Sequence, residues 1–226
     1  MFRRITRSLG LLALGIAFGI GLSAEAGAQQ NSGFLKDYSK LEVQKDPLGV
    51  ERRAWASPDF TKEKYQKVLI EKVVYYPAPK ASDRVSMQTL NEIRDYVEAA
   101  MRKAFSGVVP LADKPGPGVA RVRMAVTAAS VDTGLKPYQL LPVGLVFTAA
   151  KEASGTAKHD VQLAVEFEVT DSESGKPLAM SVRDAKGIEV TGDQKLTLAM
   201  AKPKIDQWAE GGRQVIEMRL KQGVAK

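Results

Sequence analysis

The sequence predicts a two-layer α+β domain, in which a mostly antiparallel sheet carries two helices on one face. The first observation is the stretch Val161–Val169, where apolar residues occupy every odd position and polar or small residues every even position. Such alternation is typical of a β-strand with one buried face. The second observation is a helical spacing of apolar residues near Ser86–Phe105 and Pro203–Lys221. Since each helix offers one apolar stripe, both are expected to pack on the same wall of the sheet.

The first 28 residues have the three parts of a secretory signal peptide. Three arginines precede an apolar run of 14 residues, Leu9–Leu22, and small-residue cleavage sites follow at Ala26 and Ala28. The run is shorter than the roughly 20 residues that span a bilayer as a helix, which favours cleavage over anchoring. Cleavage after Ala28 removes three arginines and one glutamate and leaves 198 residues with a net charge of +5. A chain of this length forms one domain of ordinary size.

The chain contains no cysteine. It therefore forms no disulfide, offers no thiolate for catalysis or metal binding, and has no cysteine that could carry an amino-terminal lipid. A signal peptide without a following cysteine predicts a periplasmic protein, with secretion or membrane association as alternatives. The modest basic surplus is spread along the chain, which is typical of a soluble protein more than of one with a dedicated acidic partner.

Residues 29–64 are expected to form an extended arm that packs on a single domain of residues 65–226. Aromatic residues near Arg52 and Arg53 also occur in proteins that bind single-stranded nucleic acid. Export and the lack of a dense basic groove argue against nucleic acid as a partner. The arm is instead expected to be held by apolar side chains buried in surface grooves, namely Phe34, Leu35, Tyr38, Leu41 and Trp55.

The domain is predicted to begin with a strand at Tyr65–Tyr76, which a Pro-Ala-Pro sequence ends. Ser86 is a suitable N-cap for the first helix, and Gly107 a suitable end. The turn Pro115–Gly118 leads into a second strand, Val119–Val131. A phosphate-binding loop requires a helix directly after its glycines, so this turn is predicted to be structural.

After the alternating strand, Asp171–Gly175 is predicted to be a hairpin turn into an antiparallel strand from Lys176 onward, with Leu178, Met180 and Val182 as its apolar residues. Asp171 and Glu173 lack the number and spacing of calcium ligands, so turn chemistry accounts for them better. In the last helix, Pro203 is expected in the first turn, and two adjacent glycines weaken the middle.

The stretch Leu140–Ala150 fits neither period. It is apolar on every side, interrupted by Pro142 and Gly144, and too short to span a membrane. It is predicted either to plug one end of the sheet or to form an exposed patch for an envelope protein, a membrane surface or a second copy of the chain. The candidate contact residues are Tyr138, Leu140, Leu141, Val143, Leu145 and Phe147.

The sequence shows no familiar catalytic set. His159 is the only histidine, which excludes a histidine cluster for zinc and a triad with a histidine base. Glu166 and Glu168 lie on one face of a strand, about 6.5 to 7 Å apart by the strand rise. Paired carboxylates at that separation serve glycoside hydrolysis. They also form the polar face of an amphipathic strand, so the prediction is a non-enzymatic protein without metal or cofactor, with a hydrolase as the alternative.

Several short motifs occur in order along nearly the whole mature chain. They are Gly33–Leu41, Tyr75–Pro79, Pro115–Val119, Gly134–Tyr138, Leu141–Gly144 and Leu163–Asp171. Together they resemble a bacterial family of exported envelope proteins that is catalogued as a domain of unknown function. Many of its members look like lipoproteins, with a cysteine after the signal that receives the lipid, and this chain departs from them there. The resemblance brings no catalytic residues, and we predict a non-enzymatic binding or assembly protein of the cell envelope.

Overall fold

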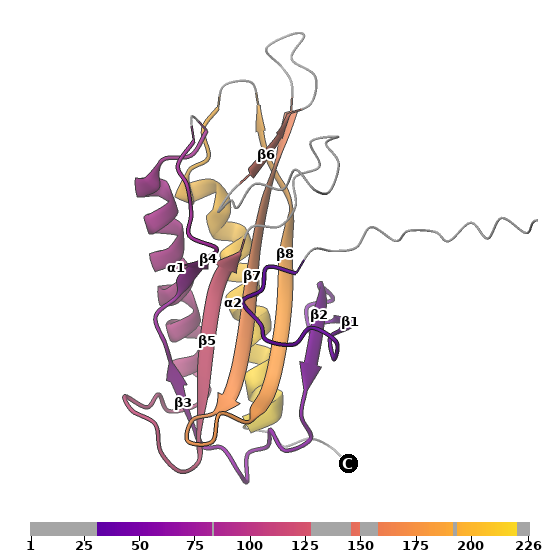
Figure 1. The fold of residues 1–226 in the computed structure, drawn as a ribbon, viewed down its shortest axis with the longest axis vertical. Helices are drawn as coiled ribbons and strands as arrows, with labels where there is room; N and C mark the ends of the chain where they lie inside the picture. The colour runs from indigo at the N-terminus through magenta and orange to yellow at the C-terminus, as the bar shows by residue number, and fades with distance from the viewer. Residues whose placement is uncertain (1–30, 83, 128–145, 150–157, 192–193, 221–226) are drawn as a thin grey trace, which may run out of the picture.

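The computed structural model describes residues 31–82, 84–127, 146–149, 158–191 and 194–220 (Figure 1). The proposed signal peptide, residues 1–28, lies outside these ranges. In chain order the elements are β1 (Glu42–Lys45), β2 (Glu51–Ala56), β3 (Lys67–Ile70), β4 (Val74–Tyr76), α1 (Met87–Ser106), β5 (Val119–Thr127), β6 (Val146–Ala149), β7 (Lys158–Asp171), β8 (Pro177–Thr191) and α2 (Leu198–Leu220).

All eight strands belong to one sheet with the order β1-β2-β8-β7-β5-β3, in which β4 also pairs with β5 and β6 with β7. The pairs are antiparallel except that β3 and β4 run parallel to β5, the strand that follows α1. Both helices lie on the same side of the sheet (Figure 1). The predicted α+β fold, with a mostly antiparallel sheet and two helices on one face, is confirmed.

The hairpin of β7 and β8 is the longest pairing in the sheet and begins at the predicted turn. The side chain of Asp171 accepts the N–H groups of Glu173 and Ser174, at 3.2 and 2.8 Å. Gly175 has a positive φ of 71°, a conformation that favours glycine. Asp171 therefore closes the turn, as the sequence predicted. Its hydrogen bonds within the turn account for an acidic residue at this position.

The main core lies between the sheet and both helices. Alternation on β7 buries Val161, Leu163 and Val165, which are each 1% exposed. The predicted N-cap of α1 is confirmed, since Ser86 Oγ accepts the N–H of Thr89 at 3.0 Å. The remaining members of this core include the apolar stripes of the two helices, namely Leu90, Ile93, Val97, Met101, Phe105, Ala201, Ile205, Trp208 and Ile216.

Two boundaries differ from the sequence prediction. The single strand expected at Tyr65–Tyr76 is two strands, because the N–H of Val73 donates to the carboxylate of Glu98 on α1, at 3.0 Å, and so leaves the strand ladder. The second helix begins at Leu198, so Pro203 lies inside it and not in its first turn. The segment before this helix is held by Leu196, whose N–H donates to the carbonyl of Arg84 at 2.9 Å.

Residues 32–41 cover the other face of the sheet, opposite the helices. Phe34 and Leu35 are 7% and 2% exposed and form a second apolar cluster with Ala125, Met180 and Val182. Within residues 29–64, β1 and β2 extend the sheet beyond β8. The division of the chain into an arm and a domain stays a prediction.

Tyr38 connects this covering segment to the sheet. Its hydroxyl donates to Glu166 Oε2 at 2.6 Å and accepts the N–H groups of Gly33 and Leu35, at 3.0 and 3.2 Å. Burial, together with the hydrogen bond to Glu166, raises the pKa of Tyr38. The phenol therefore keeps its proton at neutral pH and donates it in a hydrogen bond to Glu166, which is 2% exposed.

We expect Tyr38→Phe to lower the free energy of unfolding by about 1–3 kcal/mol, because a buried acceptor loses its donor. Denaturant titration of both proteins measures this difference. Tyr76→Phe is the matched control: the Tyr76 ring packs edge-on against Phe34 at 6.0 Å, and its hydroxyl makes no hydrogen bond among the described residues. Equal effects of the two changes would show that the Tyr38 hydroxyl does not hold the segment.

Candidate functional site

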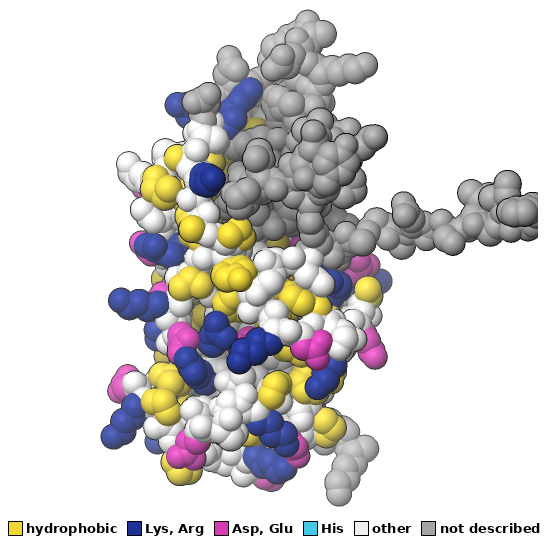
Figure 2. All heavy atoms as spheres, in the orientation of Figure 1, with side chains coloured by type: hydrophobic (Ala, Val, Ile, Leu, Met, Phe, Trp, Pro, Cys, Tyr) yellow, Lys and Arg dark blue, Asp and Glu magenta, His cyan; other side chains and the backbone are white. Residues whose placement is uncertain are grey.

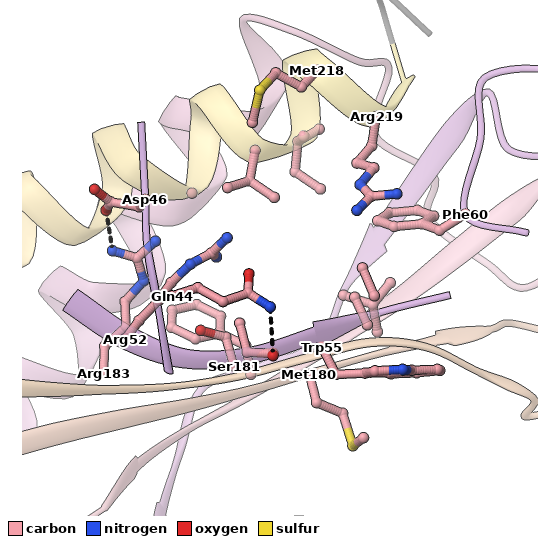
Figure 3. Close-up of a pocket in the computed structure, with 18 of the residues that line it drawn as sticks. Gln44, Asp46, Arg52, Trp55, Phe60, Met180, Ser181, Arg183, Met218 and Arg219 are labelled. Atoms are coloured by element: carbon pink, nitrogen blue, oxygen red, sulfur yellow. Dashed lines mark hydrogen bonds and ion pairs between the residues drawn. The ribbon is translucent and has the colours of Figure 1, made fainter. Parts of the chain in front are cut away.

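A cavity of about 570 Å³ lies between the sheet and α2, on the face that carries the helices. Figure 3 shows α2 above it and the strands of the sheet below. Six paired strands spaced by about 4.8 Å span about 24 Å, whereas two helices of about 10 Å cover about 20 Å. The outer hairpin of β1 and β2 therefore extends past the helical layer and encloses this space with α2. The volume lies in the range of small-molecule sites, about 300–1,000 Å³.

A buried ion pair forms one end of the cavity. Arg183 Nη1 on β8 donates to Asp46 Oδ2 at 2.6 Å, and the two side chains are 3% and 0% exposed. Asp46 lies in the turn between β1 and β2, where its Oδ1 accepts the N–H groups of Leu48 and Val50, both at 2.9 Å. The carboxylate is therefore fully bonded, and the pair joins the outer hairpin to the centre of the sheet.

Three polar atoms at this end have no hydrogen-bond partner among the described residues. They are Nη2 of Arg183, Oγ of Ser181 and Nε of Arg52. Arg183 and Ser181 are 2% and 8% exposed, and both line the cavity. A buried polar group without a partner costs about 1–3 kcal/mol, more when it is charged. Native structures pair such groups with water or with a ligand, so these atoms mark where a polar molecule in the cavity would be bound.

The electrostatic environment of the cavity is positive. Burial, with repulsion from Arg183, lowers the pKa of Arg52 to about 10, and Arg219 adds to the repulsion while Asp46 opposes it. The guanidinium therefore remains charged at neutral pH. Arg219 extends from α2 towards the cavity near Phe60 (Figure 3). Four basic residues and two carboxylates line the space, which favours an anion.

The cavity changes from polar to apolar along β8. Successive residues that line it are Arg183, Ser181 and Ala179, and they pair with Val165, Phe167 and Val169 on β7. The other end is lined mainly by apolar side chains, and Arg219 also lies there, beside Phe60 (Figure 3). The apolar residues include Phe60, Phe105, Val122 and Val215. The cavity is thus amphipathic, with its unpaired donors at one end.

A register shift in the sheet decides which side chains line the cavity. The sequence places Leu178, Met180 and Val182 on one face of a strand. A β-bulge between Val169 and Thr170 changes the pairing, so Leu178 joins the helix-side core while Met180 and Val182 join the cluster on the opposite face. Ser181 and Arg183 are consequently turned towards α2.

Two glycines of α2 allow close packing over the ion pair. A Cβ atom on Gly211 would contact the Asp46 carboxylate and lie 3.0 Å from Arg183 Nη1, and one on Gly212 would lie 3.2 Å from the ring of Phe105. These glycines, which the sequence suggested would weaken the helix, let α2 approach the hairpin and α1.

The residues that the sequence proposed for chemistry lie elsewhere. Glu166 and Glu168 are on the face of β7 away from the helices, 2% and 6% exposed. Glu166 accepts from Tyr38, and Glu168 accepts from Arg123 Nη1 at 2.6 Å. Neither carboxylate lines the cavity. Among the described residues, no group of three or more His, Cys, Asp or Glu side chains is placed to hold a metal ion.

The proposed partner segment is described only in part. Tyr138, Leu140, Leu141, Val143 and Leu145 lie outside the described residues. Phe147 lies on β6, where it pairs with Val161 of β7. His159 is on β7, opposite Val190. The candidate contact surface stays a prediction.

Sequence analysis missed the residues of the cavity. The sequence pattern singled out Arg52 only as part of a mixture of basic and aromatic residues. It did not single out Asp46, Ser181 or Arg183. The available signal was the alternation of polar Ser181 and Arg183 with apolar Met180 and Val182 along β8. This signal can be interpreted only when the bulge shows which face of the sheet Ser181 and Arg183 occupy.

Fold and cavity together define a class, an α+β protein with a covered sheet and an amphipathic cavity between its outer hairpin and its last helix. Residues 30–211 match the family described as protein of unknown function (DUF3313), and the chain belongs to that family. The family predicted from the sequence, a bacterial domain of unknown function, is confirmed.

Known proteins give the family context. The chain is 32% identical over 196 residues to the uncharacterised lipoprotein YdcL of Escherichia coli strain K12, covering 85% of each. Among solved structures it is similar to the PelC dodecamer from Paraburkholderia phytofirmans, at 12% identity and a TM-score of 0.37, covering 71% of this chain and 96% of that one. Protein XCC0632 from Xanthomonas campestris gives 10% identity and a TM-score of 0.36, covering 79% and 97%. Neither the family description nor the name of the E. coli relative gives an enzymatic activity.

We expect Gly211→Ala to destabilise the protein, because the new methyl group presses on the Asp46–Arg183 pair. Overpacking costs about 1–3 kcal/mol, against roughly 1 kcal/mol that alanine returns in helix propensity. Gly212→Ala is the control, and its smaller clash with a ring edge is expected to leave stability about unchanged. Thermal unfolding of both variants measures the difference, and a Gly211→Ala protein as stable as the control would contradict the close packing.

Proposed function

We propose that this protein is a non-enzymatic, periplasmic protein of the cell envelope that binds a small molecule in the cavity beneath α2. The observation that carries the proposal is the pair of buried, unpartnered donors, Arg183 Nη2 and Ser181 Oγ, at the polar end of that cavity. A protein interior rarely leaves such groups without a partner, so a ligand that bonds to them stabilises the folded state.

The sequence and the family support export. The first 28 residues have the pattern of a cleaved signal peptide, and the E. coli relative is a lipoprotein by name. Within the described residues, no helix combines the length and the apolar character needed to cross a membrane. We place the mature protein in the periplasm.

The positions of the two carboxylates support a binding role over hydrolysis. A general acid or base must come within hydrogen-bond reach of its substrate. Glu166 and Glu168 lie beneath the segment of residues 32–41 and are bonded to Tyr38 and Arg123. A hydrolase that used this pair would first have to displace that segment.

Binding of a macromolecule is a separate part of the proposal. On the face that Figure 2 shows, basic, acidic and apolar side chains are interspersed, and the basic ones form no continuous groove. This distribution supports the exclusion of nucleic acid as a partner. The stretch Leu140–Ala150 stays our proposed contact for an envelope protein, a membrane surface or a second copy.

Native mass spectrometry of the protein isolated from cell envelopes tests the binding role. We expect a small molecule to accompany the wild-type protein. Val215→Trp fills the cavity from α2 and is expected to reduce the bound fraction about tenfold or more, since a bulky ring displaces the ligand. Val74→Trp is the matched control, because Val74 is 45% exposed on β4 and does not line the cavity. A wild-type protein without any bound molecule, or a Val215→Trp protein that binds it as the control does, would contradict the proposal.

A further inference from the structure

We infer that the ligand of this cavity is an anionic amphiphile with a single acyl chain. Its carboxylate or phosphate head is bound by Arg52, Ser181 and Arg183, and its chain lies along the apolar end. This inference rests on the proposed binding function and specifies the chemistry of that same site.

The head group follows from the unpartnered donors. Ala54 pairs with Ser181 and Arg53 with Val182, so the neighbouring Arg52 lies beside Arg183 on adjacent strands. Nη1 of Arg183 is bonded to Asp46, whereas its Nη2, the Nε of Arg52 and the Oγ of Ser181 are unpaired within the described part of the chain. Guanidinium groups bind carboxylate and phosphate oxygens with charge-assisted bonds. One anionic oxygen cluster can accept from all three donors.

The charge balance of the cavity wall favours an anionic ligand over a neutral one. Asp46 is paired with Arg183, and Glu42 and Lys45 on β1 offset one another, so Arg52 and Arg219 remain as uncompensated positive charges on the cavity wall. No ion pair of Arg52 or Arg219 occurs among the described residues. An anionic head would neutralise this excess charge where water is partly excluded, and a neutral head would leave it uncompensated.

The chain follows from the size and the walls of the cavity. From Arg183 to Ala179 the strand advances four residues, about 13 Å at the rise of a β-strand. At that end the walls include the apolar side chains of Phe60, Phe105 and Val169, with Arg219 beside Phe60. A cavity of about 570 Å³ holds roughly nineteen groups of the ~30 Å³ that a water molecule occupies. An inorganic anion fills a small part of that space, whereas one acyl chain of ordinary length fills most of it.

Isothermal titration of the mature protein, freed of bound molecules, tests the chemistry with three probes below their aggregation concentrations. Oleate supplies both head and chain, monoolein the chain with an uncharged head, and inorganic phosphate a head alone. We expect oleate to bind, monoolein to bind at least about tenfold more weakly, and phosphate to give no saturation where oleate saturates. Each methylene buried by the chain strengthens binding about fourfold, which separates oleate from phosphate.

Matched variants test the head-group site. Arg52→Met removes the charge that faces the cavity, and we expect it to weaken oleate binding about tenfold or more, as for a lost charge-assisted hydrogen bond. Arg53→Met removes the same charge from the same strand. Arg53 does not line the cavity and bonds to Asn31 at 3.0 Å, so this control is expected to bind oleate within about twofold of wild type. If Arg52→Met does not fold, Ser181→Ala decides, since it removes an unpaired hydroxyl and is expected to bind oleate several-fold more weakly.

The outcomes separate the two proposals. Equal binding of oleate and monoolein would overturn the anionic head, and so would unchanged oleate binding by Arg52→Met. If Arg52→Met does not fold, unchanged oleate binding by a folded Ser181→Ala would overturn it instead. Phosphate that binds as well as oleate would overturn the acyl chain. A bound molecule in native mass spectrometry that oleate does not displace would disprove the amphiphile and leave the binding function intact. A protein that neither carries a molecule nor binds any probe would disprove both and show a cavity that holds water only.

Discussion

The buried pair of Asp46 and Arg183 is the contact on which the architecture around the cavity depends. One carboxylate closes the turn between β1 and β2 through two backbone N–H groups and anchors that hairpin to β8 through the guanidinium. With both side chains almost fully enclosed, removal of either partner leaves a buried charge, which is strongly destabilising. Gly211 belongs to the same arrangement, because only a residue without a side chain lets α2 pass so close to the pair.

Both faces of the sheet are covered, but by different means. The helices bury one face with long apolar stripes, whereas residues 32–41 cover part of the other with Phe34 and Leu35 and with the hydroxyl of Tyr38. That second face carries charged side chains, including Arg123 and Glu168, which neutralise one another. Arg53, next to Val182 on that face, keeps two nitrogen atoms unpaired among the described residues, but it does not line the cavity. The unpaired donors that line the cavity, on Arg52, Ser181 and Arg183, face α2.

This distribution supports the binding role proposed for the chain. Three donors that line the cavity, Arg52 Nε, Arg183 Nη2 and Ser181 Oγ, have no partner in the described part of the chain, and they are the basis of the binding role proposed above. The match to the family over residues 30–211 assigns the chain to a group without a described activity. A binding role in the cell envelope is consistent with that group and with the lipoprotein character of the E. coli relative.

The sequence by itself determined the fold class, the first helix with its cap at Ser86 and the hairpin turn at Asp171, because alternation, helical spacing and capping are local properties of neighbouring residues. It also determined the family, which the match over residues 30–211 shows. Only the tertiary structure decided the cavity. Asp46 and Arg183 are 137 positions apart, and a single bulge near Val169 turns Ser181 and Arg183 towards α2 and Met180 away from it. No local period records such a register shift, since moving a strand by one residue exchanges its two faces without changing the sequence pattern.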